Sequence, residues 1–255
     1  MDTASVERWA AQLDDARRSR SGCAPLTDTV ALDLDAAYAI QAALTARRLA
    51  RGERVVGWKL GYTSLAMRGQ MGIDRPNFGP LTDTMLLASG GTVSPSLIQP
   101  RVEPEIALRL ARSLRGEVTG DEVLDAVGSA CACLEVVDSV YPDYRFRIED
   151  NTADGSSAAQ VVLGPALAST ERLDEVPVVL ARNGEPVATA TGAAASGHPV
   201  AGVVWLVARL AERGEELRPG DVVITGGLTA AVPLAPGDVV DATFAGDVQV
   251  SVCRG

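Results

Sequence analysis

The stretch that decides the fold reads Arg101-Val-Glu-Pro-Glu-Ile-Ala-Leu-Arg-Leu110, and its apolar residues recur with a period of two. One face carries Val102, Ile106, Leu108 and Leu110, and the opposite face carries Glu103 and Glu105. Such alternation is typical of a half-buried β-strand. Residues two apart on a strand project from the same face about 7 Å from each other. The stretch therefore predicts a strand that carries two carboxylates side by side.

A second acidic strand is predicted at Cys131-Ala-Cys-Leu-Glu-Val-Val-Asp138, where Glu135 interrupts an apolar run. A glutamate in a buried strand is costly unless it is paired or binds a metal. Three carboxylates from two strands suit a hard divalent ion. The alternative is a solvated strand face with ordinary glutamates. The pattern alone favours that alternative for Glu103 and Glu105, and favours it less for Glu135.

The cysteines of this second strand and the single histidine each allow a functional and a structural interpretation. Cys131 and Cys133 share a strand face with Glu135, which would allow a soft-metal site together with His198, but buried structural thiols are the preferred interpretation. His198 is the only histidine and stands just before a predicted helix. We interpret it as a helix-entry residue in preference to a catalytic one.

Lys59 is the only lysine among 23 cationic residues, and it lies in the strand-like run Val55-Val-Gly-Trp-Lys-Leu60. A lysine on an edge strand ordinarily extends its ammonium group to solvent. If Lys59 is buried instead, we expect a lowered pKa that makes it a usable acid or base, and a charge that attracts an anionic substrate. The absence of any other lysine favours a required role for this one.

The overall composition excludes several functions. The chain of 255 residues has 33 acidic residues against 23 basic ones and a net charge of −10, which argues against nucleic-acid binding. One histidine excludes multi-histidine zinc sites and disfavours a Ser-His-Asp triad. We find no signal-peptide pattern and no apolar run near the roughly 20 residues of a membrane span. With four scattered cysteines, we expect a cytoplasmic protein with reduced thiols.

The order of predicted elements indicates an α+β or mixed α/β fold around a substantial sheet. Helical patterns occupy the first 52 residues, with Ser5 and Asp35 as candidate N-caps, and further helices are predicted at 121–130 and 199–212. The sequence Pro-Gly-Asp-Val-Val occurs at 219–223 and again at 236–240, each time as a turn that begins a strand. We divide the chain into a mainly helical region, 1–75, and a β-rich catalytic core, 76–255.

Seven segments, taken in order, resemble the 2-keto-4-pentenoate hydratase / 4-oxalocrotonate decarboxylase family of the fumarylacetoacetate hydrolase superfamily. They are Gly57-Trp-Lys-Leu-Gly-Tyr-Thr-Ser64, Gln70-Met-Gly-Ile-Asp-Arg-Pro-Asn-Phe-Gly79, Val102-Glu-Pro-Glu-Ile106, Leu134-Glu-Val-Val-Asp-Ser139, Asp154-Gly-Ser-Ser157, Gly197-His-Pro199 and Thr225-Gly-Gly-Leu-Thr229. The resemblance covers residues 35 to 254 and implies a mixed β-sandwich roll with an N-terminal helical region.

The same resemblance implies a function and its residues. It implies Mg²⁺ or Mn²⁺ held by Glu103, Glu105 and Glu135, and an active-site lysine at Lys59. A small 2-oxo acid would chelate the metal, which stabilises its enolate as a Lewis acid. Lys59 would hold the substrate or relay a proton. Further substrate contacts are expected from Asn77, Ser157 and Thr225.

Departures from the family pattern leave the branch open. Asn77 stands where family hydratases usually have aspartate, which removes a carboxylate that could activate water. The segment Thr225–Pro233 looks closer to the decarboxylase branch, and Gly155 replaces an asparagine common in both. We lead with a hydratase of 2-hydroxypenta-2,4-dienoate type and keep 4-oxalocrotonate decarboxylase as the alternative. A non-catalytic partner subunit is a further alternative, and a C–C hydrolase is a weaker one.

The resemblance also suggests how the chain associates. We expect a homo-oligomer, which a sister decarboxylase or hydratase could join in a complex. No nucleic-acid or membrane partner is expected.

Overall fold

Two β-sheets dominate the computed structural model, which describes residues 1–64, 68–69 and 73–255. The larger sheet has the strand order β2-β1-β10-β5-β6-β7-β3, with β11 paired to β5. Its strands are β1 (Val55–Gly61), β2 (Asn77–Thr82), β3 (Leu86–Ala88), β5 (Arg101–Leu110), β6 (Val127–Val137), β7 (Ala158–Ala166), β10 (Val222–Ile224) and β11 (Val232–Pro233). The β1–β10 and β3–β7 pairs are parallel and the other pairs are antiparallel, so the expected mixed sheet is confirmed.

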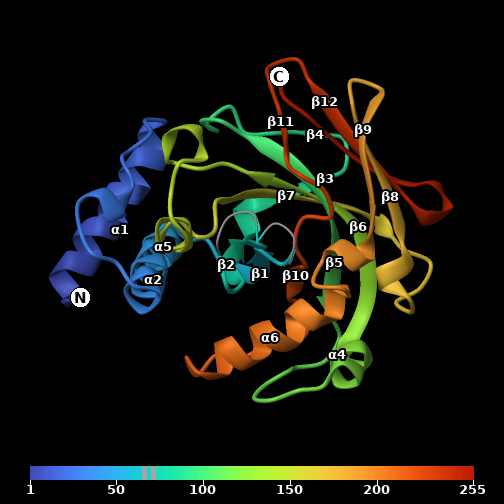
Figure 1. Cartoon of the computed structure of the whole chain (residues 1–255), viewed down its shortest axis with the longest axis horizontal. Helices are drawn as coiled ribbons and strands as arrows, with labels where there is room; N and C mark the ends of the chain where they lie inside the picture. Colours follow the sequence, from blue (N-terminus) through green and yellow to red (C-terminus); the bar gives the residue numbers. More distant parts are fainter. Residues whose placement is uncertain (65–67, 70–72) are drawn as a thin grey trace.

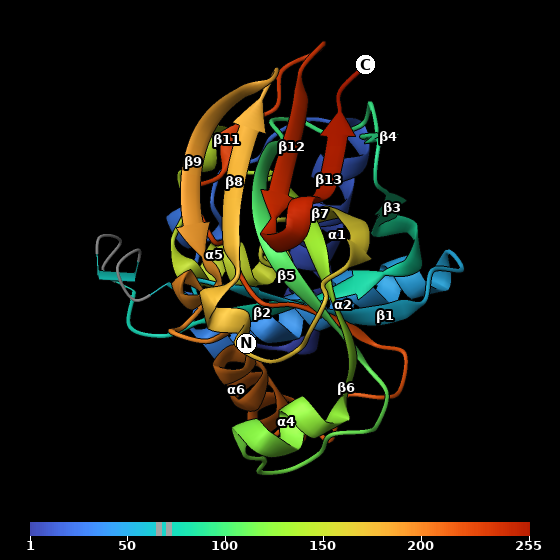
Figure 2. The same cartoon turned by 90° about the vertical axis from the view of Figure 1, so that its right-hand side faces the viewer.

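The smaller sheet has the order β4-β13-β12-β8-β9 and forms a separate layer (Figure 2). Its strands are β4 (Gly91–Thr92), β8 (Pro177–Arg182), β9 (Glu185–Thr191), β12 (Val239–Phe244) and β13 (Val248–Cys253). Leu180, Phe244 and Val250 from this sheet belong to the same buried cluster as Ile106 and Leu134 from the larger one. The main core therefore includes apolar side chains from both sheets.

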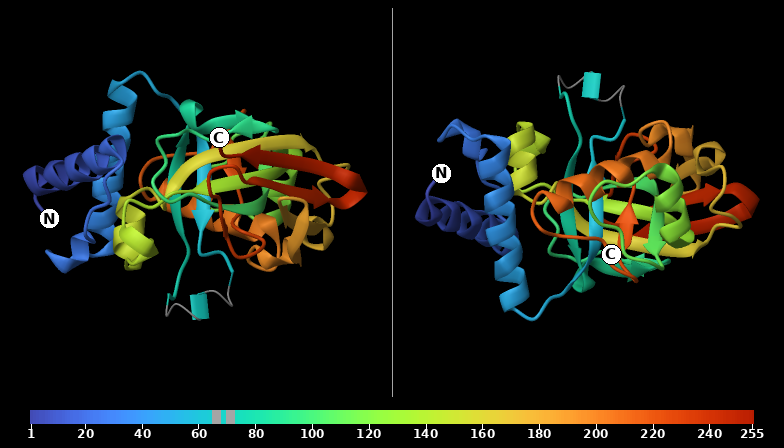
Figure 3. Two further views of the ribbon diagram at one scale, coloured as in Figure 1. Left: turned by 90° about the horizontal axis from the view of Figure 1, so that it is seen from above. Right: turned by 90° about the horizontal axis from the view of Figure 1, so that it is seen from below.

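The N-terminal helices α1 (Thr3–Ser19) and α2 (Leu34–Ala50) lie together at one side of the molecule, next to α5 (Ile148–Ala153) (Figure 1). Seen from above and below, they lie at the end opposite the β12–β13 hairpin (Figure 3). They have their own buried cluster, which includes Leu13, Ile40 and Tyr141. Gln41 ties α2 to the rest of the fold, because its Nε2 donates to Phe78 O (2.9 Å) and Thr152 O (2.7 Å).

Several predicted helix boundaries need correction. The N-caps are Asp2 and Asp33, not Ser5 and Asp35, since their carboxylates accept the N–H groups of Ser5 and Ala36. The helix expected at 121–130 is α4 (Gly120–Ala126), and the chain enters β6 at Val127, which pairs with Leu110. The sequence also predicts a short helix at 63–71, and this stretch and the start of the segment 70–79 fall partly outside the described residues.

The last long helix, α6 (Pro199–Ala211), lies within the stretch Gly192–Ala211, which is long and apolar enough by composition to cross a membrane. It is the one such stretch among the described residues. Only 13 of its residues form α6, and Val203, Leu206 and Leu210 belong to the main core. This is the packing of a core helix.

Candidate active site

The larger sheet brings four charged side chains together from three strands. β1 carries Lys59, β5 carries Glu103 and Glu105, and β6 carries Glu135. The antiparallel register of β5 and β6 places Glu103 directly opposite Glu135. One carboxylate oxygen from each of the three glutamates lies within 4.8 Å of the others. The structure thus assembles the predicted metal-ligand set, with Glu105 and Glu135 fully buried.

Lys59 closes this group on one side and is 3 % exposed. Its Nζ lies 2.8 Å from Glu135 Oε1 and donates to Ser156 O at 2.9 Å. Burial by itself lowers the pKa of this ammonium group, but Glu135, Glu103 and Glu105 outweigh burial and the pKa is raised. The lowered pKa expected from burial is therefore wrong for this environment, and Lys59 is a cation at neutral pH.

The glutamates show the opposite effect. Burial, and then the charge of Glu135, raise the pKa of Glu103 to about 8, and the pKa of Glu105 lies well above its ordinary value for the same reasons together with the charge of Glu103. Burial disfavours the charged form of each carboxyl group, and repulsion among the carboxylates adds to this effect. Two of their oxygens, Glu105 Oε1 and Glu135 Oε2, have no hydrogen-bond partner among the described residues.

The turn after β10 is hydrogen-bonded to the Glu105 carboxylate. The backbone N–H of Gly226 donates to Glu105 Oε2 at 2.6 Å. Gly226 has φ = +106°, a conformation that favours glycine. A Cβ on the next residue, Gly227, would collide with the Glu103 carboxylate. The two glycines therefore let the backbone approach both metal-ligand candidates.

A cavity of about 350 Å³ opens onto Lys59 and Glu103. Ser157, predicted to contact the substrate, lies in its wall. Asn77 and Thr225 are buried outside the lining. Asn77 donates to Asn151 Oδ1 and Thr152 Oγ1 and accepts from Ser156 Oγ, whereas Thr225 Oγ1 donates to Ile106 O. Asn77 thus fixes the residue whose carbonyl oxygen holds Lys59.

The cavity wall also contains residues that are not among the sequence-based candidates, including Tyr62, Arg101, Tyr144 and Phe146. Arg101 shares a strand face with Glu103, and its guanidinium lies 4.2 Å from the centroid of the Tyr144 ring. It has no carboxylate partner within 4.0 Å among the residues with described positions. The position of Arg101 two residues before Glu103 could have identified it as a site residue from the sequence, since strand alternation points both side chains to one face.

The other residues that the sequence analysis considered, His198 and the two cysteines of β6, make structural contacts. His198 is the N-cap of α6, and its Nδ1 accepts the N–H of Val200 at 3.1 Å. Its Nε2 lies 3.7 Å from Asp174 Oδ1. Cys133 is fully buried beside the glutamates and Cys131 is half-buried, and neither belongs to the carboxylate cluster that can hold a metal.

Two packed sheets carry three clustered carboxylates beside a buried lysine, and this group is a candidate all-oxygen cation site on a mixed β-fold. The sequence profile of the fumarylacetoacetate (FAA) hydrolase C-terminal family matches residues 54–253. The chain belongs to this family, and the expected fold class is confirmed.

Individual relatives cover most of the chain. It is 41% identical over 240 residues to a 2-keto-4-pentenoate hydratase from Paraburkholderia xenovorans (strain LB400), covering 92% of this chain and 89% of that protein. It is 39% identical over 219 residues to a 4-oxalocrotonate decarboxylase from Pseudomonas sp. (strain CF600), covering 84% and 83%. The solved 4-oxalocrotonate decarboxylase from Pseudomonas putida G7, complexed with magnesium and adipate, superposes with a TM-score of 0.95 at 34% identity, covering 100% and 99% of the two chains.

Proposed function

We propose that the protein is a divalent-metal-dependent lyase that acts on small 2-oxo or 2-hydroxydienoate acids. The observation that carries the proposal is the cluster of Glu103, Glu105 and Glu135 beside Lys59 at the end of a cavity. Hydratase and decarboxylase relatives, and a structural neighbour solved with magnesium, support the same class.

The residues present fit Mg²⁺ or Mn²⁺. All three side chains offer oxygen, the donor that hard divalent ions prefer. Glu105 Oε1 and Glu135 Oε2 are buried without hydrogen-bond partners among the described residues, as expected for atoms that contact a cation. When ionised, three carboxylates and the Lys59 ammonium leave a net charge of −2, which a divalent ion neutralises.

When bound, the ion would supply a Lewis acid that polarises the keto and carboxylate oxygens of a 2-oxo acid. The chain's own residues supply binding and proton transfer. Lys59 presents an ammonium group whose position is fixed by Glu135 and Ser156, so it can bind a substrate oxygen and donate a proton to it. Burial and Glu103 raise the pKa of Tyr62, which therefore stays a neutral hydrogen-bond donor in the cavity wall.

Within this class, water addition to a 2-hydroxypenta-2,4-dienoate, giving a 4-hydroxy-2-oxo acid, is the first candidate reaction. The identity of 41% to a hydratase over most of both chains supports it. Decarboxylation of a 2-oxo-3-enedioate is the second candidate, and Arg101 favours it. A cation in the cavity wall without a carboxylate partner suits a substrate with a second carboxylate at its far end.

Product analysis separates the candidates. The protein is dialysed against a chelator and assayed with and without Mg²⁺ on 2-hydroxypenta-2,4-dienoate and on 4-oxalocrotonate. Water addition to the dienoate supports the hydratase, and CO₂ release from the enedioate supports the decarboxylase. If neither acid is turned over with Mg²⁺ present, the chain is a non-catalytic partner subunit and the proposal fails.

The role of Arg101 gives a separate prediction. Arg101→Met is expected to raise KM for a dicarboxylate substrate by about 10- to 100-fold, the usual effect of losing a hydrogen bond to a charged group. KM for a monocarboxylate should change little. Arg109→Met, at the exposed end of the same strand, is the matched control. Equal KM changes for both substrates would refute a contact with the distal carboxylate.

Metal binding is expected to depend on pH. Because the pKa of Glu103 is raised to about 8 and that of Glu105 is raised in the same direction, protons compete with the cation for these carboxylates. Mg²⁺ affinity should therefore rise from pH 6 to 8, with proton release that calorimetry in buffers of different ionisation enthalpy detects.

The same shifts affect the stability of the chelated protein. The folded state binds more protons than the unfolded state between the ordinary glutamate pKa and about 8, so the free energy of unfolding should fall as pH rises through that window. Thermal melts in chelator at pH 5 and pH 8 measure this fall. Stability that rises with pH over the same window would contradict the assigned environment of the glutamates.

Self-association is also part of the proposal. The outer face of the smaller sheet exposes Val179, Val187 and Val239 at 38%, 48% and 44%. We propose this face as the association surface, because two copies that meet there would remove these apolar side chains from water. We therefore retain a homo-oligomer, with a sister enzyme as a second possible partner, and light scattering after size exclusion tests the oligomer.

A further inference from the structure

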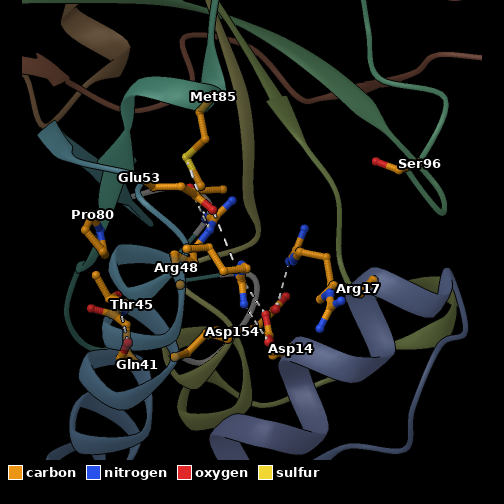
Figure 4. Close-up of a pocket in the computed structure, with 15 residues that line it drawn as sticks. Asp14, Arg17, Gln41, Thr45, Arg48, Glu53, Pro80, Met85, Ser96 and Asp154 are labelled. Atoms are coloured by element: carbon orange, nitrogen blue, oxygen red, sulfur yellow. Dashed lines mark hydrogen bonds and ion pairs between the residues drawn. The ribbon is translucent and has the colours of Figure 1, made fainter.

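A second cavity of about 390 Å³ lies between the N-terminal helices and the larger sheet (Figure 4), and its lining includes neither Lys59 nor the three glutamates. α1 contributes Arg17 to it and α2 contributes Arg48, and Asp154 and Gly155 close it on the sheet side. The next two residues, Ser156 and Ser157, line the candidate active site. One turn thus forms a wall of both cavities.

The lining of this cavity carries an excess of positive charge. Four arginines, Arg17, Arg18, Arg48 and Arg51, stand against three carboxylates, Asp14, Glu53 and Asp154. Two of the arginines are well paired. Arg51 donates to both oxygens of Asp14 at 2.8 and 3.0 Å, and Arg17 donates to Asp154 Oδ1 at 2.8 Å. With all groups ionised, the balance of charge is +1.

Of the four arginines, Arg18 is exposed and accounts for the excess charge, and Arg48 has the poorest partners of the other three. Its one ion pair among the described residues joins Nε to Glu53 Oε2 at 3.3 Å, and that oxygen already accepts the hydroxyls of Thr82 and Thr84 at 2.6 and 2.8 Å. Among the described residues, its Nη1 contacts the sulfur of Met85, at 3.9 Å. The Arg48 side chain is 22% exposed, so part of the guanidinium is open to the cavity.

The electrostatic environment of Arg48 agrees with these contacts. Burial lowers the pKa of Arg48, and the charges of Arg17 and Arg51 lower it further, while Glu53 opposes them. Each of these three guanidinium groups has a carboxylate partner, and a further anion beside Arg48 would reduce the remaining repulsion among them.

We propose that this cavity is a binding site for a small monocarboxylate anion, held by the guanidinium of Arg48. A planar carboxylate matches the fork of a guanidinium better than a spherical anion does, and one negative charge cancels the excess of the lining. The site is independent of the proposed lyase activity, because it uses none of the metal-ligand candidates.

Calorimetric titration of acetate into the chelator-dialysed full-length protein tests the site. The expected result is one binding event per chain with a Kd on the order of 1 mM. Arg48→Gln should weaken binding about tenfold or more. Arg54→Gln is the matched control, since the Arg54 side chain is 80% exposed and does not line the cavity, and it should leave the affinity unchanged.

Other outcomes overturn the proposal. They are no acetate binding to the native protein, equal binding by Arg48→Gln, and binding of inorganic phosphate without binding of acetate. A change of oligomer mass in Arg48→Gln with unchanged acetate affinity would assign the cavity to a subunit contact instead. If Arg48→Gln does not fold, Arg48→Lys decides, because it keeps the charge and loses the fork. Native affinity in Arg48→Lys would then refute a guanidinium-specific site.

Discussion

Replacing Lys59 by methionine is expected to lower kcat by about 10²- to 10⁴-fold, the usual contribution of a positioned proton donor. The ammonium group is held between Glu135 and Ser156 at the edge of the cavity, and no other lysine exists in the chain to replace it. Mg²⁺ affinity should stay equal or increase, because the substitution removes a positive charge that lies 2.8 Å from a ligand candidate. Steady-state kinetics and Mg²⁺ titration on the same variant measure both effects.

Lys59→Arg separates charge from proton transfer. The guanidinium keeps a cation near Glu135 but does not release its proton at ordinary pH. We expect substrate KM to be closer to native in Lys59→Arg than in Lys59→Met, while kcat stays low in both. Near-normal turnover of Lys59→Met would show that Lys59 has only a structural role, as the ion-pair partner of Glu135.

The second large effect is expected for Glu105→Gln, which should weaken Mg²⁺ binding by about 100-fold or more, since ligand carboxylates cannot be replaced by a neutral amide without losing charge. The fold should survive, because an amide oxygen can still accept the Gly226 N–H that now reaches Glu105 Oε2. At a pH where the glutamates are ionised, the removal of one carboxylate from a repelling group should also raise the melting temperature of the chelated protein. Calorimetric Mg²⁺ titration and thermal melts measure the two outcomes.

Glu185→Gln provides the control for charge alone. Glu185 is an exposed residue of β9 on the smaller sheet, so its substitution changes net charge equally without approaching the glutamate cluster. It should leave Mg²⁺ affinity unchanged. An unchanged affinity in Glu105→Gln as well would remove Glu105 from the proposed ligand set.

The chemistry of the candidate site was more predictable from the sequence than its geometry. Alternation on 101–110 predicts that Glu103 and Glu105 share a face, and the structure has them so. The pairing of Glu103 with Glu135 depends on the register between two strands, which local pattern does not encode. The sequence pattern alone therefore favours a solvated strand face, whereas the fold buries two of the three carboxylates.

The cavity wall was less predictable for a related reason. Asn77 begins β2 and Thr225 follows β10, and their side chains bond to neighbouring elements and lie outside the cavity lining. Tyr144 and Phe146 reach the cavity from a loop without periodicity, so no spacing rule points to them. The N-terminal helices begin a few residues earlier than predicted, because Asp2 and Asp33 are equally good N-caps.

The order in which the chain supplies the site has a consequence for folding kinetics. Lys59 lies on β1, which reaches the glutamates only through β10, a strand more than 160 residues later in the chain that pairs with both β1 and β5. Contacts of such high sequence separation form late and slowly. Mg²⁺ should therefore leave the early refolding phases unchanged and slow unfolding instead, and a nascent chain that ends before Val222 should not acquire the complete site.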